Sequence, residues 1–495
     1  MDCPYRVPQY AGLTCSQYKA QIIYMREIIM PDNSKACVSL ENGRVLPHFD
    51  RAAAIVLIAV TAVFLAQFGF KGCSFAPDTK SYVAFSSRVN FLYPWFLAVF
   101  RAVFGETHYF FFCALFQNLL TAWCIFSLCE YLRRQLSLTF AGFLGIAVTM
   151  SGCFLMQLVF TENGSVTSNI IISEGLAYPF YLLFVKYALY AWEKATVKGL
   201  LPAVLLSFAL IAVRGQLSWT ILVIFVLTVR ALRHKKISRV RSAVIGAAVA
   251  AAVYLLCSGL NTCSNVYQHG TRQNSTMGRS VILATAFYCS EADDASLFPE
   301  NSDERSCAND IINFIDENKC AARYAPESIT ERFFYFTKEY DVLKDNLSAF
   351  ILKYTDVEDA TVFCLRMAGR IILCHPWNVL CHTSTNFLAG AVRSVAIFSA
   401  PFIVLSVLFY LISIAAVKFC RRKKILVRES RYMLAALVLT CINCWFVSMG
   451  VFALSRYMFY NLPLLYTGAE IFFLRFLSFF LAKGKSDPSG HRQPV

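Results

Sequence analysis

The chain has 495 residues, of which 57% are hydrophobic and 16% are charged, and its mean hydropathy is +0.53. This composition excludes a soluble globular protein and is typical of a polytopic membrane protein, whose surroundings are the lipid bilayer. The net charge of +15 does not indicate a nucleic-acid partner, because residues 260–390 hold 11 basic and 17 acidic side chains and the basic excess lies elsewhere, in short loops beside apolar runs. Such loops are typical of cytoplasmic segments.

Residues 1–50 contain no long apolar run, so we expect a cytoplasmic N-terminal arm without a cleavable signal peptide. Cys3, Cys15 and Cys37 in this arm are spaced too widely for a zinc knuckle, which favours free thiols. The first membrane span is predicted at residues 52–70, about 19 residues without a charge, roughly the length that crosses a hydrocarbon core.

The first outer loop, residues 71–107, follows this span and carries a lone acid, Asp78. Its second half, residues 91–105, is apolar but only about 15 residues long, and it contains Pro94 and Arg101. We therefore expect this segment to be a helix that lies in the membrane interface. Asp78 is then held at the outer surface between two membrane anchors.

The next three spans are predicted at residues 108–128, 138–160 and 170–192, with Glu174 at the outer end of the last one. The apolar stretch 200–229 could form one long helix, but its two flanking basic loops would then fall on opposite sides of the membrane. Splitting it into residues 199–213 and 217–232, with an outer turn at Arg214, keeps both loops inside. A seventh span follows at residues 242–260.

The remainder of the chain is predicted to hold a mainly helical extracytoplasmic domain and three more spans. The domain covers residues 261–390 and interrupts the membrane helices, which occupy residues 51–260 and 391–482. The last spans are expected at residues 392–419, 432–454 and 462–481, followed by a cytoplasmic tail at residues 483–495. About ten spans result, in an all-α fold with both ends inside. Glu470 and Arg475 in the last helix are expected to pair with other helices rather than with each other.

Charged side chains gather at the predicted outer ends of these helices. The acids are Asp78 and Glu174, and the cations of the same layer are Lys80, Arg88, Arg214 and Arg456. A carboxylate there can activate an acceptor hydroxyl as general base, and cations near the lipid surface can hold a phosphate leaving group. Simpler interpretations stay open, since Asp78 can be a solvated loop acid and Arg214 can snorkel to lipid phosphates.

The same residues resemble a known family. The similarity is to the GT-C superfamily of integral membrane glycosyltransferases, and it is carried by Pro77-Asp78-Thr79-Lys80-Ser81-Tyr82, the run from Arg88 to Gly105 with Tyr93-Pro94, Ile172-Ser173-Glu174, Arg214, and Ser455-Arg456-Tyr457. The resemblance covers residues 50–235 best and does not extend to residues 260–390. It implies an enzyme that uses a polyprenyl-phosphate sugar and carries an essential acid in its first extracytoplasmic loop, followed by interfacial helices.

For this chain the resemblance implies Asp78 as the catalytic base and Glu174 as a second acid that orients donor or acceptor. The implied substrate-binding residues are Lys80, Tyr82, Arg88, Arg214, Arg456 and Tyr457. The family's acid is often part of an Asp-x-Asp or Asp-Glu pair, whereas Asp78 has no acidic neighbour. We therefore assign no metal ligands, and a divalent cation is left only as an option.

We expect a hexosyl- or pentosyltransferase that moves a sugar from an undecaprenyl- or dolichyl-phosphate carrier to a glycan, lipid or protein acceptor. Its site would face the extracytoplasmic side of the cell membrane and serve the cell-envelope glycan. The alternative is a transporter or flippase of lipid-linked saccharides, in which the same charges line a path and the helices form inverted repeats. A third hypothesis is a non-enzymatic scaffold whose outer domain binds a partner.

Overall fold

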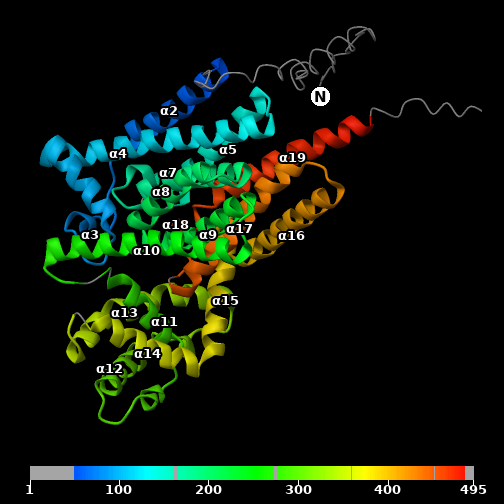
Figure 1. Cartoon of the computed structure of the whole chain (residues 1–495). Helices are drawn as coiled ribbons and strands as arrows, with labels where there is room; N and C mark the ends of the chain where they lie inside the picture. Colours follow the sequence, from blue (N-terminus) through cyan, green and yellow to red (C-terminus); the bar gives the residue numbers. More distant parts are fainter. Residues whose placement is uncertain are drawn as a thin grey trace, which may run out of the picture.

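A computed structural model describes residues 50–160, 165–272, 274, 276–357, 359–450 and 452–484. The N-terminal arm up to residue 49 and the tail from residue 485 therefore lie outside the described residues. The described chain is all helical, apart from an isolated bridge that joins Ser74 to Ile170 (Figure 1). The predicted all-α class is confirmed.

A helix occupies each segment that the sequence predicts to cross the membrane. These helices are α2 (Arg51–Lys71), α4 (Leu92–Leu136), α5 (Phe140–Leu155), α7 (Glu174–Lys194), α8 (Val197–Val213), α9 (Thr220–His234), α10 (Arg239–His269), α16 (Ala400–Lys423), α17 (Val427–Gly450) and α19 (Leu462–Gly484). Among the described residues, seven helical stretches are long and apolar enough to cross a membrane, and α8 is a shorter apolar helix. These helices support a multi-pass membrane protein, and the count of ten spans stays a prediction.

Four helices that begin beside basic residues start with a polar capping residue. Asp50, Thr139, Thr196 and Ser238 each accept a hydrogen bond from the backbone N–H three residues on, at the starts of α2, α5, α8 and α10. Such caps satisfy amide groups that a helix leaves unpaired in its first turn. Asp50 also pairs with Arg133 near the end of α4, at 2.7 Å. The start of α2 and the end of α4 therefore meet at one basic end of the bundle.

The long helix α4 consists of two arms that run in different directions (Figure 1). They meet at Gly105, whose φ of 72° and ψ of 169° are non-helical. Glycine adopts this combination readily because it has no Cβ. The rings of Phe104 and Phe112 stack across the bend with centroids 4.0 Å apart. The first arm, up to Phe104, corresponds to the short helix predicted at residues 91–105, and its location in the membrane interface stays a prediction.

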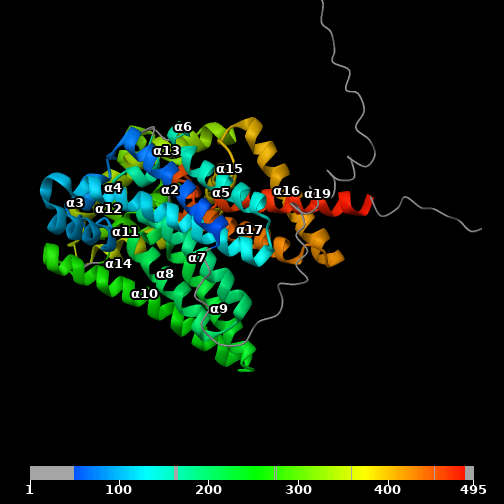
Figure 2. The ribbon, with the colours of Figure 1, turned by 90° about the horizontal axis from the view of Figure 1, so that it is seen from above.

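The apolar stretch 200–229 is divided as the loop charges predict. Helix α8 ends at Val213, Arg214 follows in extended conformation, and a 3-10 turn, η3 (Gly215–Trp219), leads into α9. Helices α8, α9 and α10 lie side by side, visible in Figure 2. Arg214 therefore sits at a turn between two helices and not in the middle of a long one.

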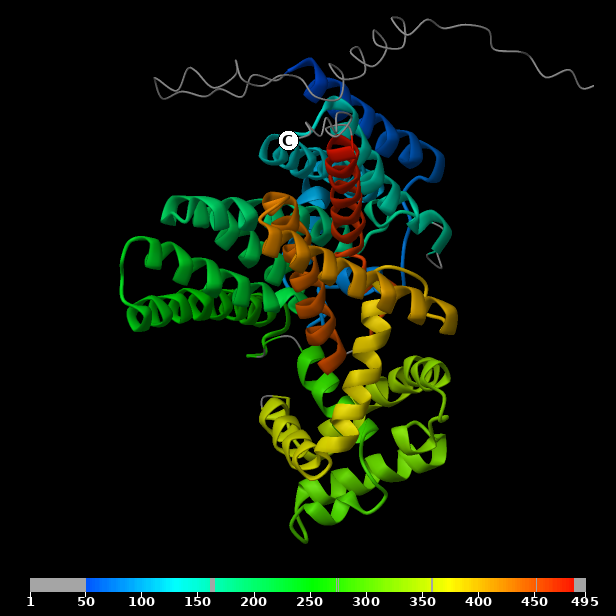
Figure 3. The same cartoon turned by 90° about the vertical axis from the view of Figure 1, so that its right-hand side faces the viewer.

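A group of helices between α10 and α16 has a hydrophobic core of its own. It contains α11 (Thr276–Tyr288), α12 (Asp303–Asn318), α13 (Ile329–Tyr354), α14 (Ala360–Cys374) and α15 (Pro376–Arg393). Figures 1 and 3 show α11–α14 in the lower part of the molecule, with α15 reaching down beside them. Tyr340 of α13 donates a hydrogen bond to the carbonyl of Gly450, at 2.9 Å, so this α11–α15 domain adjoins the end of α17. Its predicted limits at residues 261 and 390 fall inside α10 and α15.

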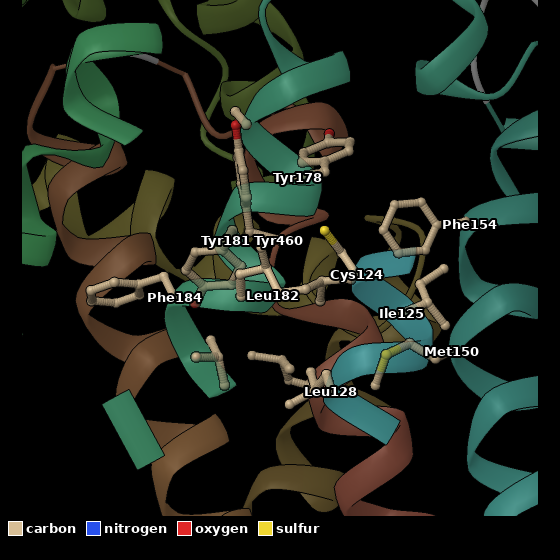
Figure 4. Close-up of a cluster of buried hydrophobic side chains, with 14 of the residues drawn as sticks. Cys124, Ile125, Leu128, Met150, Phe154, Tyr178, Tyr181, Leu182, Phe184 and Tyr460 are labelled. Carbon is tan, nitrogen blue, oxygen red and sulfur yellow. The ribbon is translucent and has the colours of Figure 1, made fainter. Parts of the chain in front are cut away.

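The main core lies among α4, α5 and α7 and contains many aromatic rings (Figure 4). Tyr460 packs edge-on against Tyr178 and Tyr181, with centroids 4.5 and 5.3 Å apart. Among the described residues all cysteines are free, and most of them are buried, including Cys124. Buried free cysteines of this kind pack as small apolar side chains.

The last helix α19 is tied to its neighbours through Arg475. Its guanidinium donates to the carbonyls of Leu136 and Ser137, at 2.5 and 2.8 Å, and lies 3.7 Å from the carboxylate of Glu429. The carbonyls at the end of a helix lack intrahelical partners, and a cation there is favourable. The prediction that Arg475 pairs with other helices is thus confirmed.

Candidate functional site

The connection between α2 and α4 is held against the segment that precedes α7. The backbone N–H of Ser74 donates to Asn169, at 2.9 Å, and that of Ile171 donates to Ser74, at 3.0 Å. Farther along, the Thr79 hydroxyl donates to the carbonyl of Ile171, at 2.8 Å. These bonds fix the short helix α3 (Thr79–Val83) beside the start of α7. Asp78 and Glu174, far apart in sequence, are thereby brought to the same place.

Three buried amide side chains hold the segment that precedes α7 in place. Gln67 of α2, Asn118 of α4 and Asn169 form a closed hydrogen-bonded network with distances of 2.5 to 3.0 Å. All three side chains are buried. A buried amide costs free energy unless its donors and acceptors are paired, so the network specifies one position for the 165–173 segment.

Asp78 uses its carboxylate for a distant contact and not for its own helix. It precedes α3, yet its side chain makes no capping hydrogen bond there. Instead it accepts a hydrogen bond from Nη1 of Arg456, at 2.9 Å, and its side chain is 47% exposed. An ordinary solvated loop acid needs no such partner. The side chain of Asp78 is therefore fixed in position and still accessible to solvent.

Glu174 is buried and paired with two arginines. Only 1% of its side chain is exposed, and its Oε2 lies 2.5 Å from Nη1 of Arg214. Nε of Arg456 lies 3.8 Å from the other oxygen, Oε1. The hydroxyl of Ser173 donates to Glu174, at 3.1 Å, and Tyr82 lies 2.8 Å from that hydroxyl. The position of Glu174 in the first turn of α7 is also favourable for a negative charge.

The two arginines face the same aromatic ring. The guanidinium carbons of Arg214 and Arg456 lie 4.7 and 5.1 Å from the centre of the Tyr457 ring. Nη2 of Arg456 donates to the Tyr457 hydroxyl, at 3.1 Å, and Nε of Arg214 donates to Gln216, at 3.0 Å. Cation–π contacts and hydrogen bonds thus fix both planes. Arg456 is the more accessible, with 35% of its side chain exposed against 15% for Arg214.

Arg456 lies on α18 (Ser455–Met458), a four-residue helix that polar side chains from other elements hold in place. The carbonyl of Arg456 accepts from the hydroxyl of Tyr178, at 2.5 Å, and the carbonyl of Tyr457 accepts from Asn443, at 3.0 Å. Arg393 donates to the carbonyl of Ala453, at 2.9 Å. So short a helix is not stable alone, and these contacts from α7, α17 and α15 determine its position.

The neighbouring side chains keep the arginines of this cluster positively charged. Burial by itself would lower the pKa of Arg456, but Tyr457, Glu174 and Asp78 raise that pKa above its ordinary value. Burial, followed by the charge of Glu174, raises the pKa of Tyr82, so its hydroxyl stays protonated. The cluster therefore combines two guanidinium charges, the carboxyl groups of Asp78 and Glu174, and the protonated phenol of Tyr82.

Some predicted site residues lie outside this cluster. Lys80 and Arg88 are exposed, whereas Arg214 and Arg456 make the ion pairs with Asp78 and Glu174 that are described above. Tyr82 and Tyr457 are 7% and 8% exposed, so they hold the charged side chains and present little surface of their own. Two cavities, of about 240 and 340 Å³, lie elsewhere, in the α11–α15 domain and between α4 and α7 at the basic end.

The cluster offers no evident set of metal ligands. Asp78 and Glu174 are bridged by Arg456, and within the described residues no group of three or more His, Cys, Asp or Glu side chains is placed to hold a metal ion. Carboxylates that are engaged with guanidinium groups have fewer lone pairs for a cation. We assign no residue of this site to a divalent cation.

Sequence reasoning did not assign Ser173 or Tyr178 to the site. Ser173 joins Glu174, Arg214 and Tyr82, and Tyr178 holds the backbone of Arg456. A signal was available for Tyr178, because it follows Glu174 by four residues and so shares its helix face. No protein-family model, curated protein or solved structure matches the chain.

Proposed function

We propose that the chain is a membrane glycosyltransferase of the GT-C type that transfers a sugar from a polyprenyl-phosphate carrier to an extracytoplasmic acceptor. The observation that carries this proposal is the hydrogen bond of Arg456 to Asp78, which joins a half-exposed acid to a group of cations at the ends of the helices. A base and a phosphate-binding charge are the two functions that such a transfer needs. The assay is the movement of a radiolabelled sugar from polyprenyl phosphate in purified, reconstituted protein.

In the proposed reaction the carboxylate of Asp78 takes the proton of the acceptor hydroxyl. The acceptor oxygen forms a bond to the anomeric carbon, the bond from that carbon to the phosphate oxygen breaks, and the electron pair leaves with the polyprenyl phosphate. Asp78 suits this role because its side chain is accessible and held by one hydrogen bond. Entry of the donor phosphate beside Arg456 would compete for that guanidinium and free the carboxylate.

The cations would stabilise the leaving phosphate. The side chain of Arg456 is 35% exposed, so its guanidinium can be reached by a donor phosphate. Arg214 is engaged by Glu174, Ser173 and Gln216 and contributes its charge from the layer beneath. We therefore assign the direct phosphate contact to Arg456 and a supporting role to Arg214.

Glu174 would act as a positioning residue. Its side chain is 1% exposed, which leaves no surface for an acceptor sugar, and its oxygens face Arg214 and Arg456. A buried carboxylate between two guanidinium groups offsets their mutual repulsion and fixes their orientation. The second acid inferred from the sequence thus acts on the arginines.

Transport is the weaker hypothesis because of where the charges lie. Carrier sites are usually built near the bilayer midplane from interrupted helices. Here Glu174 begins α7 and Arg214 follows the end of α8, so both stand at helix ends. This arrangement favours a surface reaction over a path through the bundle.

The proposal includes ten spans and an outer location for the cluster, and a labelling experiment tests both. Cysteine introduced at Lys80 or Glu300 is expected to react with a membrane-impermeant maleimide from outside, whereas cysteine at Arg134, Lys236 or Lys423 should react only after permeabilisation. The reason is the basic character of the last three loops. The parent protein supplies the background, because several native cysteines are exposed. Labelling of position 236 from outside would contradict the topology and the outer location of Arg214.

Replacement of Arg456 is expected to weaken donor binding. Arg456→Ala removes a charge-assisted contact to phosphate, which is worth about 1.5–3 kcal/mol, or roughly 10- to 150-fold in Kd. Arg456→Lys should restore part of this loss, since lysine keeps the charge but lacks the planar fork. Binding of a polyprenyl phosphate to the purified protein is the measurement. Arg366→Ala, which removes an exposed arginine paired with Glu304, is the control and should bind normally. Equal Kd values for Arg456→Ala and the control would remove Arg456 from the donor site.

A further inference from the structure

The α11–α15 domain encloses a cavity of about 240 Å³ that the proposed reaction does not use. We call it the domain cavity. It is bordered by the end of α11, the segment that follows it, α13 and α15. Its lining includes Tyr288, Glu291, Arg323, Arg332, Trp377 and His382. Pockets for drug-sized ligands usually start at about 300 Å³, so this volume suits a single small ring.

Two buried polar groups of the cavity lining have no hydrogen-bond partner in the described structure. One is the hydroxyl of Tyr288, a residue that is 1% exposed, and the other is Nε of Arg323. Arg323 is otherwise engaged, because it contacts Asp316 and donates to the carbonyl of Ser290. Buried polar groups are almost always paired, so two such groups on one cavity indicate a ligand with hydroxyl groups or other small polar groups.

The charges of the cavity nearly balance. Asn378 donates to Glu291, at 2.9 Å, Arg323 pairs with Asp316, and Arg332 donates to the carbonyl of Pro326, at 3.2 Å. Burial, together with the nearby Arg332, lowers the pKa of His382 to about 4, so its imidazole is neutral at pH 7. A neutral imidazole can both donate and accept. The lining therefore offers both hydrogen-bond donors and acceptors to a polar ligand.

Aromatic rings form the rest of the wall. Phe336 and Tyr288 surround His382, with ring centroids 4.3 and 5.0 Å from the imidazole. Trp377 is 70% exposed, an unusual exposure for so large an apolar ring. A pyranose or furanose ring has C–H faces that pack on aromatic rings and an edge of hydroxyl groups that exchange hydrogen bonds. The domain cavity offers both kinds of contact.

Helix α15 connects this cavity to the segment that carries Arg456, which belongs to the charged cluster described above. Its first half lines the cavity through Trp377 and His382. Near its end, Asn386 accepts from the backbone N–H of Ala453, at 2.8 Å, and Arg393 donates to the carbonyl of the same residue, at 2.9 Å. The segment that carries Arg456 begins just after Ala453. A molecule seated in the cavity therefore contacts the helix that holds the catalytic segment.

We propose that the domain cavity binds one sugar unit of the acceptor glycan. The identification of the ligand as the acceptor rests on the proposed transfer, whereas binding of a saccharide ring by this domain can be measured independently of it. Tyr288 and Arg323 would donate to ring hydroxyls, and Trp377 would stack on one face of the ring. The acceptor is then held at two places, by this unit and by its reacting hydroxyl at Asp78.

Equilibrium binding to the full-length purified protein tests the proposal. The probes are methyl glycosides of glucose, galactose, mannose, N-acetylglucosamine and arabinose, applied up to about 50 mM because small ligands with few contacts bind near 1 mM. Saturation-transfer NMR reports which probe binds. Tyr288→Phe and Trp377→Ala are each expected to weaken that binding by at least about fivefold, a loss in the range of one hydrogen bond or ring contact.

Matched variants separate binding from stability. Tyr354→Phe removes a hydroxyl of the same domain that is already paired with Asp310, and Trp123→Ala removes a half-exposed tryptophan of α4. Both should bind the probe normally. Tyr288→Phe should keep the wild-type melting temperature, because its hydroxyl has no partner to lose in the protein. A lowered melting temperature with unchanged binding would give Tyr288 a structural role and overturn the proposal.

The same experiment distinguishes this proposal from the proposed function. If no probe binds, the cavity holds only solvent and the inference is wrong, whatever the transfer assay shows. If a probe binds but no sugar is transferred from polyprenyl phosphate, the cavity is a saccharide site and the enzymatic proposal fails. If the probe binds, and Tyr288→Phe raises the KM for an acceptor carrying that unit without changing kcat, both proposals are supported.

Discussion

Asp78→Asn is expected to lower transfer about 100- to 10,000-fold, the range that general-base catalysis contributes, while the protein stays folded. Asparagine keeps the size of the side chain and still offers an oxygen to the guanidinium of Arg456. It removes the basic oxygen, so a proton-accepting role is lost and a structural role is retained. Transfer from a radiolabelled polyprenyl-phosphate sugar and the melting temperature are measured on the same purified sample.

Glu106→Gln is the matched control for this variant. Glu106 is an exposed acid at the bend of α4 and pairs with Arg101, as Asp78 pairs with Arg456. Its replacement should change transfer by a few-fold at most. If Asp78→Asn kept more than about a tenth of the wild-type turnover, its loss would fall below the smallest effect of a general base. The base would then have to be sought at Glu174 or at Glu162, which lies outside the described residues.

Arg214→Met is expected to lower the free energy of unfolding by about 3–5 kcal/mol, the cost of leaving a buried charge without its partner. Glu174 is 1% exposed and lies 2.5 Å from Arg214, whereas Arg456 approaches it only to 3.8 Å. The carboxylate would remain buried with one distant cation. Unfolding by denaturant in detergent micelles, followed by tryptophan fluorescence, measures the change.

Two further variants make this result specific. Arg101→Met breaks a pair with Glu106, whose side chain is 67% exposed, and should cost about 1 kcal/mol or less. The double variant Glu174→Gln with Arg214→Met should lose less stability than the two single variants together, because the charge and its partner are removed at once. A loss for Arg214→Met no larger than that for Arg101→Met would show that Glu174 does not depend on Arg214.

Much of the arrangement could be predicted from loop charges. The basic loops on both sides of residues 200–229 required a turn, and the turn occurs at Arg214. The same reasoning placed Asp78, Glu174 and Arg456 in one layer, and the structure joins them. The depth of a residue in the membrane can be predicted from the order of the helices along the chain. This prediction does not require knowing which helices are neighbours.

Partner choice within the layer could not be predicted, because it depends on helix rotation and packing. Asp78 pairs with Arg456 and Glu174 with Arg214, although all four charges were assigned the same depth. Lys80 shares that depth but faces outward from α3. The amide network of Gln67, Asn118 and Asn169 was missed for the same reason, since its three members come from separate segments of the chain. Only contacts between helices reveal such groups.

The hydrogen bond between Asp78 and Arg456 joins residues 378 positions apart. A ribosome makes the chain from its first residue onward, so Asp78, Glu174 and Arg214 are all synthesised long before Arg456. A nascent chain can bury Glu174 against Arg214 early, but Asp78 stays without its arginine until residues 455–458 emerge. In the proposed enzyme, catalytic competence is therefore acquired at the end of biosynthesis, and a chain terminated before Arg456 lacks the contact on which the proposed reaction depends.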